Sequence, residues 1–176
     1  MQHKYLSIYL NDHLAGATSG VELSRRIARA HRSSARAAEV QHLAEDIAED
    51  RQSLLDLMRS LEVAPRRYKV YGGWAVEKIA RLKPNGHAHR RSGLSTVVEL
   101  ETLRMGIQGK YLLWRALAAV STESEGLDHS RLHELIDRAA SQMAIVDGLH
   151  GTAARTVLAG GHGRREALRQ AHPRPS

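Results

Sequence analysis

The spacing of apolar residues between positions 6 and 31 is the feature that most constrains this chain. They recur at steps of three and four residues, the period of an amphipathic α-helix, at Leu6, Leu10, Leu14, Ala17, Val21, Ile27 and Ala28. The pattern predicts a helix from Lys4 to His31. His13 falls in the middle of the predicted apolar face, and a titratable side chain that points into a core needs a polar partner.

Three further stretches repeat this period and predict three more helices. They run from Ala35 to Leu61, from about Ser95 to the loop at Thr122–Gly126, and from Asp128 to Leu158. The composition agrees, because 42% of residues are hydrophobic, only 4% are aromatic and Phe is absent. A core of Leu, Ala, Ile, Val and Met suits packed helices better than a β-sandwich, in which aromatic and β-branched residues are enriched.

The lengths of the connections predict how the four helices are arranged. Very short loops follow the first and third helices, so each of these should be an antiparallel neighbour of the next helix. Residues 62–94 are enough to run the length of a helix and start the third helix parallel to the second. The sequence therefore predicts an all-α fold, a four-helix bundle over residues 1–159 with a long crossover between helices two and three. The crossover should contain a short helix at Trp74–Leu82, and residues 160–176 should form a basic flexible tail.

Charge and residue usage exclude several function classes. The net charge is +7 and the pI about 10.1. Much of this excess lies in the tail, so nucleic-acid binding is not the expected function. The chain has no Cys, which excludes disulfides, thiol nucleophiles and Cys-ligated zinc. No apolar run approaches the ~20 residues of a membrane span, and the N-terminus does not read as a signal peptide, so we expect a cytoplasmic protein without membrane contact.

Four segments carry a resemblance to a known superfamily. They are YLNDHLAGATSGVELSRRIA (9–28), EDIAEDRQSLLDLM (45–58), RRYKVYGGWAVEKIARLKPNG (66–86) and LSTVVELETLRMGIQGK (94–110). The chain resembles the ferritin-like superfamily and, within it, a bacterial family that has no established activity. The resemblance implies the crossover bundle. In ferritin-like di-iron proteins, two helices each supply a Glu and the other two each supply a Glu-x-x-His motif.

The sequence matches this di-iron pattern poorly. Glu39-Val-Gln-His42 has the spacing, but His42 faces away from the predicted core. Asp147-Gly-Leu-His150 is the nearest counterpart on the last helix, with His150 inward. The candidate metal ligands are therefore a mixed set of nitrogen and oxygen donors, which would suit iron, manganese or zinc: His13, Glu39, Asp50, Glu99 and His150.

Lys110 supports a competing interpretation of the same polar residues. It is predicted to point inward, where its ammonium would supply the positive charge that a metal otherwise brings. Asp50 or Glu99 would then pair with Lys110 or Arg51, and the histidines would bond to carboxylates. We favour this buried polar network, because a full set of ferroxidase carboxylates is missing.

Motifs for catalysis or cofactor binding are not apparent. The glycine pairs lack phosphate-loop spacing and no nucleophile elbow occurs. His87, His89, Arg90 and Arg91 would make an anion or surface metal site, but a solvated loop is the simpler interpretation. Gly16, Gly20, Gly106 and Gly109 are unexpected inside helices, and indicate either tight packing or a contact between two copies. We expect a non-catalytic bundle with a binding or assembly role, present as a homodimer; the alternative is a divergent metal-binding protein.

Overall fold

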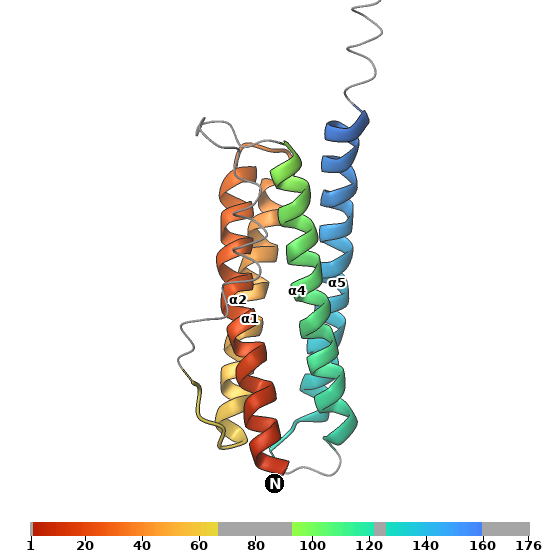
Figure 1. Ribbon diagram of the computed structural model, residues 1–176. Coiled ribbons are helices and arrows are strands. Elements are labelled where there is room, and N and C mark those ends of the chain that lie inside the picture. The colour runs from red at the N-terminus through yellow and green to blue at the C-terminus, as the bar shows by residue number, and fades with distance from the viewer. Residues whose placement is uncertain (1, 67–92, 122–125, 160–176) are drawn as a thin grey trace, which may run out of the picture.

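The computed structural model describes residues 2–66, 93–121 and 126–159 (Figure 1). All regular structure in these ranges is helical, and they contain no strand. The helices are α1 (Gln2–His31), α2 (Ala37–Ser60), α4 (Gly93–Val120) and α5 (His129–Ala154), and a π-helical turn, η1 (Arg155–Ala159), continues α5. The all-α class predicted from the sequence is thus confirmed. Within the described ranges, none of the helices combines the length and apolar character that crossing a membrane requires.

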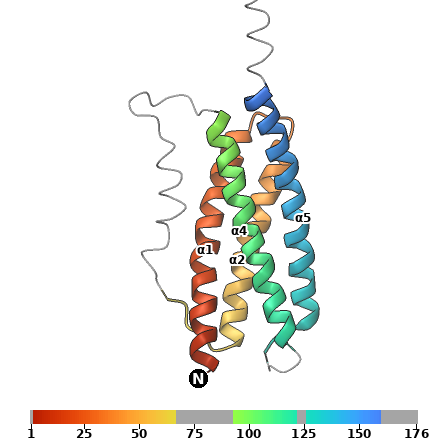
Figure 2. The same cartoon turned by 45° about the vertical axis from the view of Figure 1, so that its right-hand side comes forward.

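The four long helices lie side by side, and they run in two opposite directions (Figures 1 and 2). α1 and α5 run one way, and α2 and α4 run the other. The most extensive contacts join α4 to α5 and α1 to α2, α1 also packs on α4, and α2 touches α5 least. The length of the segment between α2 and α4 predicted that these two helices run parallel, and they do. Most of that segment (67–92), with the predicted helix Trp74–Leu82, and the tail 160–176 lie outside the described residues.

An aliphatic core with one tryptophan holds these helices together. Leu10, Met58 and Leu100 are fully buried, and Trp114 is the largest side chain among them. Burying a side chain of this size contributes roughly 1.5 to 3 kcal/mol each. The core residues recur at helical spacing on every element, so burial of one face explains why each stretch is helical.

Different contacts define the N-terminal ends of α5 and α4. Asp128 caps α5, its carboxylate accepting a hydrogen bond from the Arg131 amide at 3.1 Å. The predicted start of α4, near Ser95, lies two residues after the observed start at Gly93. A side chain at Gly93 would place its Cβ 2.5 Å from Cγ2 of Val157. The missing side chain therefore lets α4 begin earlier, against the end of α5.

Asn11 fixes the chain that leaves α2. Its side chain is 1% exposed. The Nδ2 amide donates to the carbonyl oxygens of Ser7 (2.8 Å) and Ala64 (3.2 Å), and Oδ1 accepts from the Arg66 amide at 2.6 Å. The connection after α2 is therefore attached to α1, which places its start at the N-terminal half of that helix.

Candidate functional site

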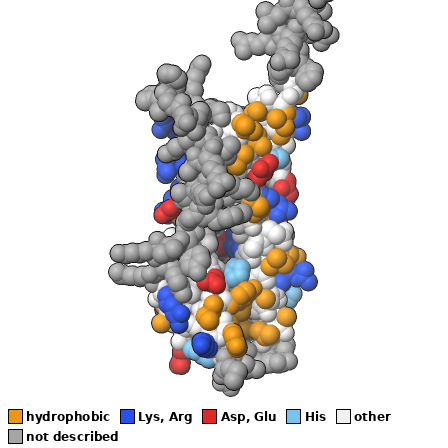
Figure 3. Space-filling view, in the orientation of Figure 1, with side chains coloured by type: hydrophobic (Ala, Val, Ile, Leu, Met, Phe, Trp, Pro, Cys, Tyr) orange, Lys and Arg blue, Asp and Glu red, His pale blue; other side chains and the backbone are white. Residues whose placement is uncertain are grey.

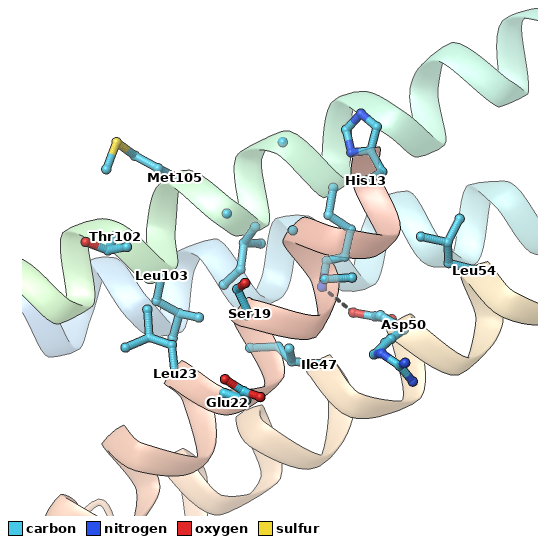
Figure 4. Close-up of a pocket in the computed structure, with 18 of the residues that line it drawn as sticks. His13, Ser19, Glu22, Leu23, Ile47, Asp50, Leu54, Thr102, Leu103 and Met105 are labelled. Atoms are coloured by element: carbon cyan, nitrogen blue, oxygen red, sulfur yellow. Dashed lines mark hydrogen bonds and ion pairs between the residues drawn. The ribbon is translucent and has the colours of Figure 1, made fainter. Parts of the chain in front are cut away.

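A pocket of about 910 Å³ opens between α1, α2 and α4. Its size is in the range of sites that hold small organic ligands. On α1 it extends from Asp12 to Arg29, which is about 25 Å of helix at 1.5 Å per residue. Figure 4 shows side chains from the three helices around this space.

Most of the deep lining is apolar. Leu23 from α1, Ile47 from α2 and Leu103 from α4 project toward one another (Figure 4). The remaining aliphatic lining comes from Leu54, Ile107 and Leu113, and Trp114 completes it. A ligand in this pocket would gain from removing apolar surface from water, by roughly 25 cal/mol per Å².

Four glycines line the pocket, Gly16 and Gly20 on α1 and Gly106 and Gly109 on α4. A Cβ built on any of them meets no heavy atom of the described residues within 4 Å. Of the two alternatives that the sequence left open for these glycines, tight packing between helices does not hold among the described residues, and a contact between two copies stays a prediction. The glycines leave space beside the helices, and that space is the pocket.

Because this space is open, alanine is expected to be tolerated at these positions. Gly106→Ala should raise the free energy of unfolding by up to about 1 kcal/mol, since glycine is the poorer helix former. Chemical denaturation followed by circular dichroism measures the change. Gly93→Ala is the matched control and should destabilise, because its Cβ would clash with Val157. A loss of stability in Gly106→Ala would show that something already fills the pocket.

A buried polar network forms the base of the pocket. The Asp50 side chain on α2 is 1% exposed. One carboxylate oxygen accepts from the Lys110 ammonium and from the Gln142 amide (2.9 Å), and the other pairs with Arg138 of α5 at 2.5 Å. Lys110 also donates to the Gln142 side-chain oxygen. The network thus joins α2, α4 and α5 where α2 and α5 make few other contacts.

The Asp50 carboxylate faces two cations, Lys110 and Arg138, and Arg138 also pairs with Glu49 at 2.6 Å. Burial lowers the pKa of Lys110 from its ordinary 10.5, and the adjacent Asp50 carboxylate opposes that shift. An ammonium has three N–H donors. Two are used by Asp50 and Gln142, and the third has no partner in the part of the chain that the structure describes. Lys110 lines the pocket, so this donor is a candidate contact for a ligand.

His13, the residue first singled out, lies at the pocket and is half-buried rather than enclosed in the core. Burial lowers its pKa from 6.5, and the nearby Asp12 partly opposes this. Its ring packs edge-on against Tyr9, with centroids 4.6 Å apart. In Figure 4 the His13 ring points away from the Asp50 carboxylate.

The other candidate metal ligands are dispersed over the molecule. Glu39 bonds to Arg36 Nε at 2.5 Å near the start of α2. Glu99 is buried and pairs with Arg26 at 3.2 Å. His150 is not inward as predicted; it lies at the surface and contacts Glu101 at 3.2 Å. Among the described residues, no three or more His, Asp and Glu side chains come close enough together to hold a metal ion.

Basic side chains surround one end of the pocket. Arg25, Arg26 and Arg29 of α1 belong to its lining. Arg51 of α2 also lines it and donates to the Thr18 hydroxyl at 3.0 Å. Arg25 and Arg29 are exposed and make no ion pair with a described residue. Asp12 and Glu22 of α1 line the pocket too, so its rim carries both charges, with basic side chains in excess, around an apolar interior.

Comparisons with family models, curated proteins and solved structures found no match. The pocket and its polar base are thus the features that bear on function. Sequence reasoning identified Asp50 and Lys110 but missed Gln142 and Arg138. The signal for Gln142 was its position three residues after Ala139 and four before Val146, both inward-facing.

Proposed function

We propose that this protein is a ferritin-like four-helix bundle with a binding role, and that the pocket between α1, α2 and α4 is its binding site. The observation that carries the proposal is a space of about 910 Å³ beside the core, kept open by four helical glycines. Each glycine costs roughly 1 kcal/mol relative to alanine in a helix. Since packing among the described residues does not require them, a ligand is the simplest reason for the open space.

The pocket's chemistry favours an amphipathic anion as the ligand. The apolar body would lie over Leu23, Ile47 and Leu103, and the anionic group would lie at Arg25 and Arg29. Guanidinium groups suit carboxylates, sulfonates and phosphates because they offer paired N–H donors. Lys110, at the base, would donate its remaining N–H to a polar atom of the ligand.

The base of the pocket supports binding in preference to proton transfer. Asp50 and Lys110 are paired with each other and with Gln142. A general acid or base has to exchange a proton with its substrate, and a carboxylate held by an ammonium and a guanidinium is poorly placed to accept one. These groups orient a ligand without reacting with it.

Fluorescence titration tests the proposal with the protein's own reporter. The chain has two tryptophans, so Trp74→Phe leaves Trp114, in the pocket lining, as the single donor. Anilinonaphthalene sulfonate, an apolar molecule with a sulfonate, should bind one-to-one and saturably, and should quench Trp114 by energy transfer. Gly106→Leu in this background should weaken binding about tenfold or more, because the new side chain occupies the pocket.

Gly148→Leu is the matched control, because Gly148 is a helical, exposed glycine outside the pocket. It should bind the probe like its parent. Equal affinity in Gly106→Leu, or probe binding only to protein that no longer unfolds cooperatively, would contradict a pocket site.

The competing function, a divergent metal-binding protein, gives a different outcome. After incubation with iron, manganese or zinc and desalting, a metal-binding chain would retain stoichiometric metal, and His13→Ala and Asp50→Ala would lose it. The binding role proposed above predicts no such retention. Elemental analysis of the full chain distinguishes the two.

A further inference from the structure

α4 carries a second apolar face, separate from the one that packs on α5. It is the most apolar of the four long helices. Its few charged side chains are Glu99, Glu101, Arg104, Lys110 and Arg115. Four of them have partners within the chain. Glu99 pairs with Arg26 and Glu101 with His150, while Arg104 pairs with Asp147 and Lys110 with Asp50. A helix that is apolar around most of its circumference is generally covered on more than one side.

The outer face of α4 exposes large aliphatic side chains. Leu94 is 46% exposed, Met105 45% and Leu112 52%. Met105 and Leu112 are one heptad apart, so they lie on one line along the helix. In Figure 3, hydrophobic side chains gather in several patches down the molecule. Scattered single apolar residues are ordinary at a surface, whereas an aligned row indicates an interaction site.

Two exposed charges of α4, Glu101 beside His150 and Arg115, make this face complementary to itself. Glu101 and Arg115 are exposed and lie two heptads apart, on the same side as Met105 and Leu112. One is acidic and the other basic, and they are nearly equidistant from Gln108–Gly109. When two such helices pack antiparallel about that midpoint, each Glu101 meets the partner's Arg115, and each Met105 meets the partner's Leu112.

We propose that the outer face of α4 is the interface of a homodimer, with α4 packed antiparallel on the partner's α4 and the twofold axis near Gln108 and Gly109. An isologous interface requires one patch to be its own complement, and this face meets that requirement in both shape and charge. Met105 and Gly109 also line the pocket, so this seam runs along the edge of the pocket's opening. The 28 residues of α4 give a seam of about 42 Å. The dimer goes beyond the ligand pocket, and its tests measure association of two chains rather than ligand binding.

Sedimentation velocity of the full chain tests the dimer. The wild type should sediment as a dimer, and Leu112→Glu should raise the dissociation constant about tenfold or more, because a charge replaces a central apolar contact. Tyr5→Glu is the matched control, since Tyr5 is 66% exposed on α1 and off this face. It should remain dimeric. A wild type that is monomeric at about 1 mM, or a Leu112→Glu protein as dimeric as the control, would overturn the proposal.

A charge exchange tests the antiparallel register. Glu101→Arg and Arg115→Glu each place like charges opposite one another, and each should weaken the dimer about fivefold. The double variant restores opposite charges and should recover most of the affinity. If the losses of dimer affinity in the two single variants simply add in the double variant, Glu101 does not pair with the partner's Arg115, and the proposed register is wrong.

Engineered cysteines give a second, independent measurement, because the chain has none of its own. In the antiparallel register, Met105→Cys/Leu112→Cys should form intermolecular disulfides under mild oxidation. Either single variant should form far fewer, since its two copies lie several residues to either side of the axis. Efficient cross-linking by both single variants would indicate a parallel dimer and overturn the proposed register.

Discussion

Asp50→Ala is expected to lower the free energy of unfolding by about 3 to 5 kcal/mol, the cost of removing one partner from a buried ion pair. The substitution leaves the Lys110 ammonium without its counter-charge while its side chain stays only 15% exposed. It also removes a buried ion-pair partner of Arg138 and the acceptor of the Gln142 amide. Urea denaturation followed by circular dichroism measures the loss.

Asp56→Ala is the control for Asp50→Ala. Asp56 lies on the same helix, is exposed and bonds to Arg59 at 3.0 Å. It should change stability by no more than about 1 kcal/mol. The triple variant Asp50→Leu/Lys110→Met/Gln142→Met should be more stable than Asp50→Ala, because it removes the Asp50 and Lys110 charges and the amide together. Arg138 keeps its ion pair with Glu49 at 2.6 Å in this variant. Equal, small losses in Asp50→Ala and Asp56→Ala would show that water reaches the network.

The helices were predictable because each buries one face along its whole length. The second helix was predicted at Ala35–Leu61 and observed at Ala37–Ser60. Val40, Leu43 and Ile47, which recur at steps of three and four in the sequence, are buried in the structure. A periodic pattern of this length is a property of local sequence and needs no knowledge of the neighbouring helices.

The buried face of α5 shows where local patterns fail. The sequence placed His150 inward, but the buried residues of this part of α5 are Gln142 and Leu149. With Leu135, Ala139 and Val146 they recur at steps of three and four with a mean of 3.5, the seam of helices packed along their length. Gln142 is polar, so a search for apolar spacing passes over it. Its burial depends on hydrogen bonds with Asp50 and Lys110, which lie on other helices.

The pocket was not predictable, because an open space depends on how far apart packed helices lie. The four glycines were recognisable as unusual in helices, yet their sequence positions do not distinguish close packing from an opening. Only the structure shows that no described heavy atom lies within 4 Å of a Cβ built at any of the four. His13 illustrates the same limit, since it lies at the border of this opening and has no need of the enclosed partner that a core position would require.

Trp114→Ala is expected to cost about 3 to 5 kcal/mol of stability, the range for deleting a buried aromatic side chain. The indole is 1% exposed, and its Nε1 has no hydrogen-bond partner among the described residues. The loss should therefore come from packing, and Trp114→Phe, which keeps a ring, should cost less than half as much.

Trp114→Ala also tests two roles of the indole, its packing in the core and its place in the pocket lining. Because the indole lies between the core and the pocket lining, its removal should enlarge the pocket as well as weaken the core. Anilinonaphthalene sulfonate that binds to folded Trp114→Ala should therefore raise the midpoint temperature of unfolding. This increase should be larger than the increase in the wild type. Thermal denaturation with and without the probe measures both effects. A Trp114→Ala protein of wild-type stability would show that the indole contributes little to the core, and an unchanged response to the probe would place the ligand elsewhere.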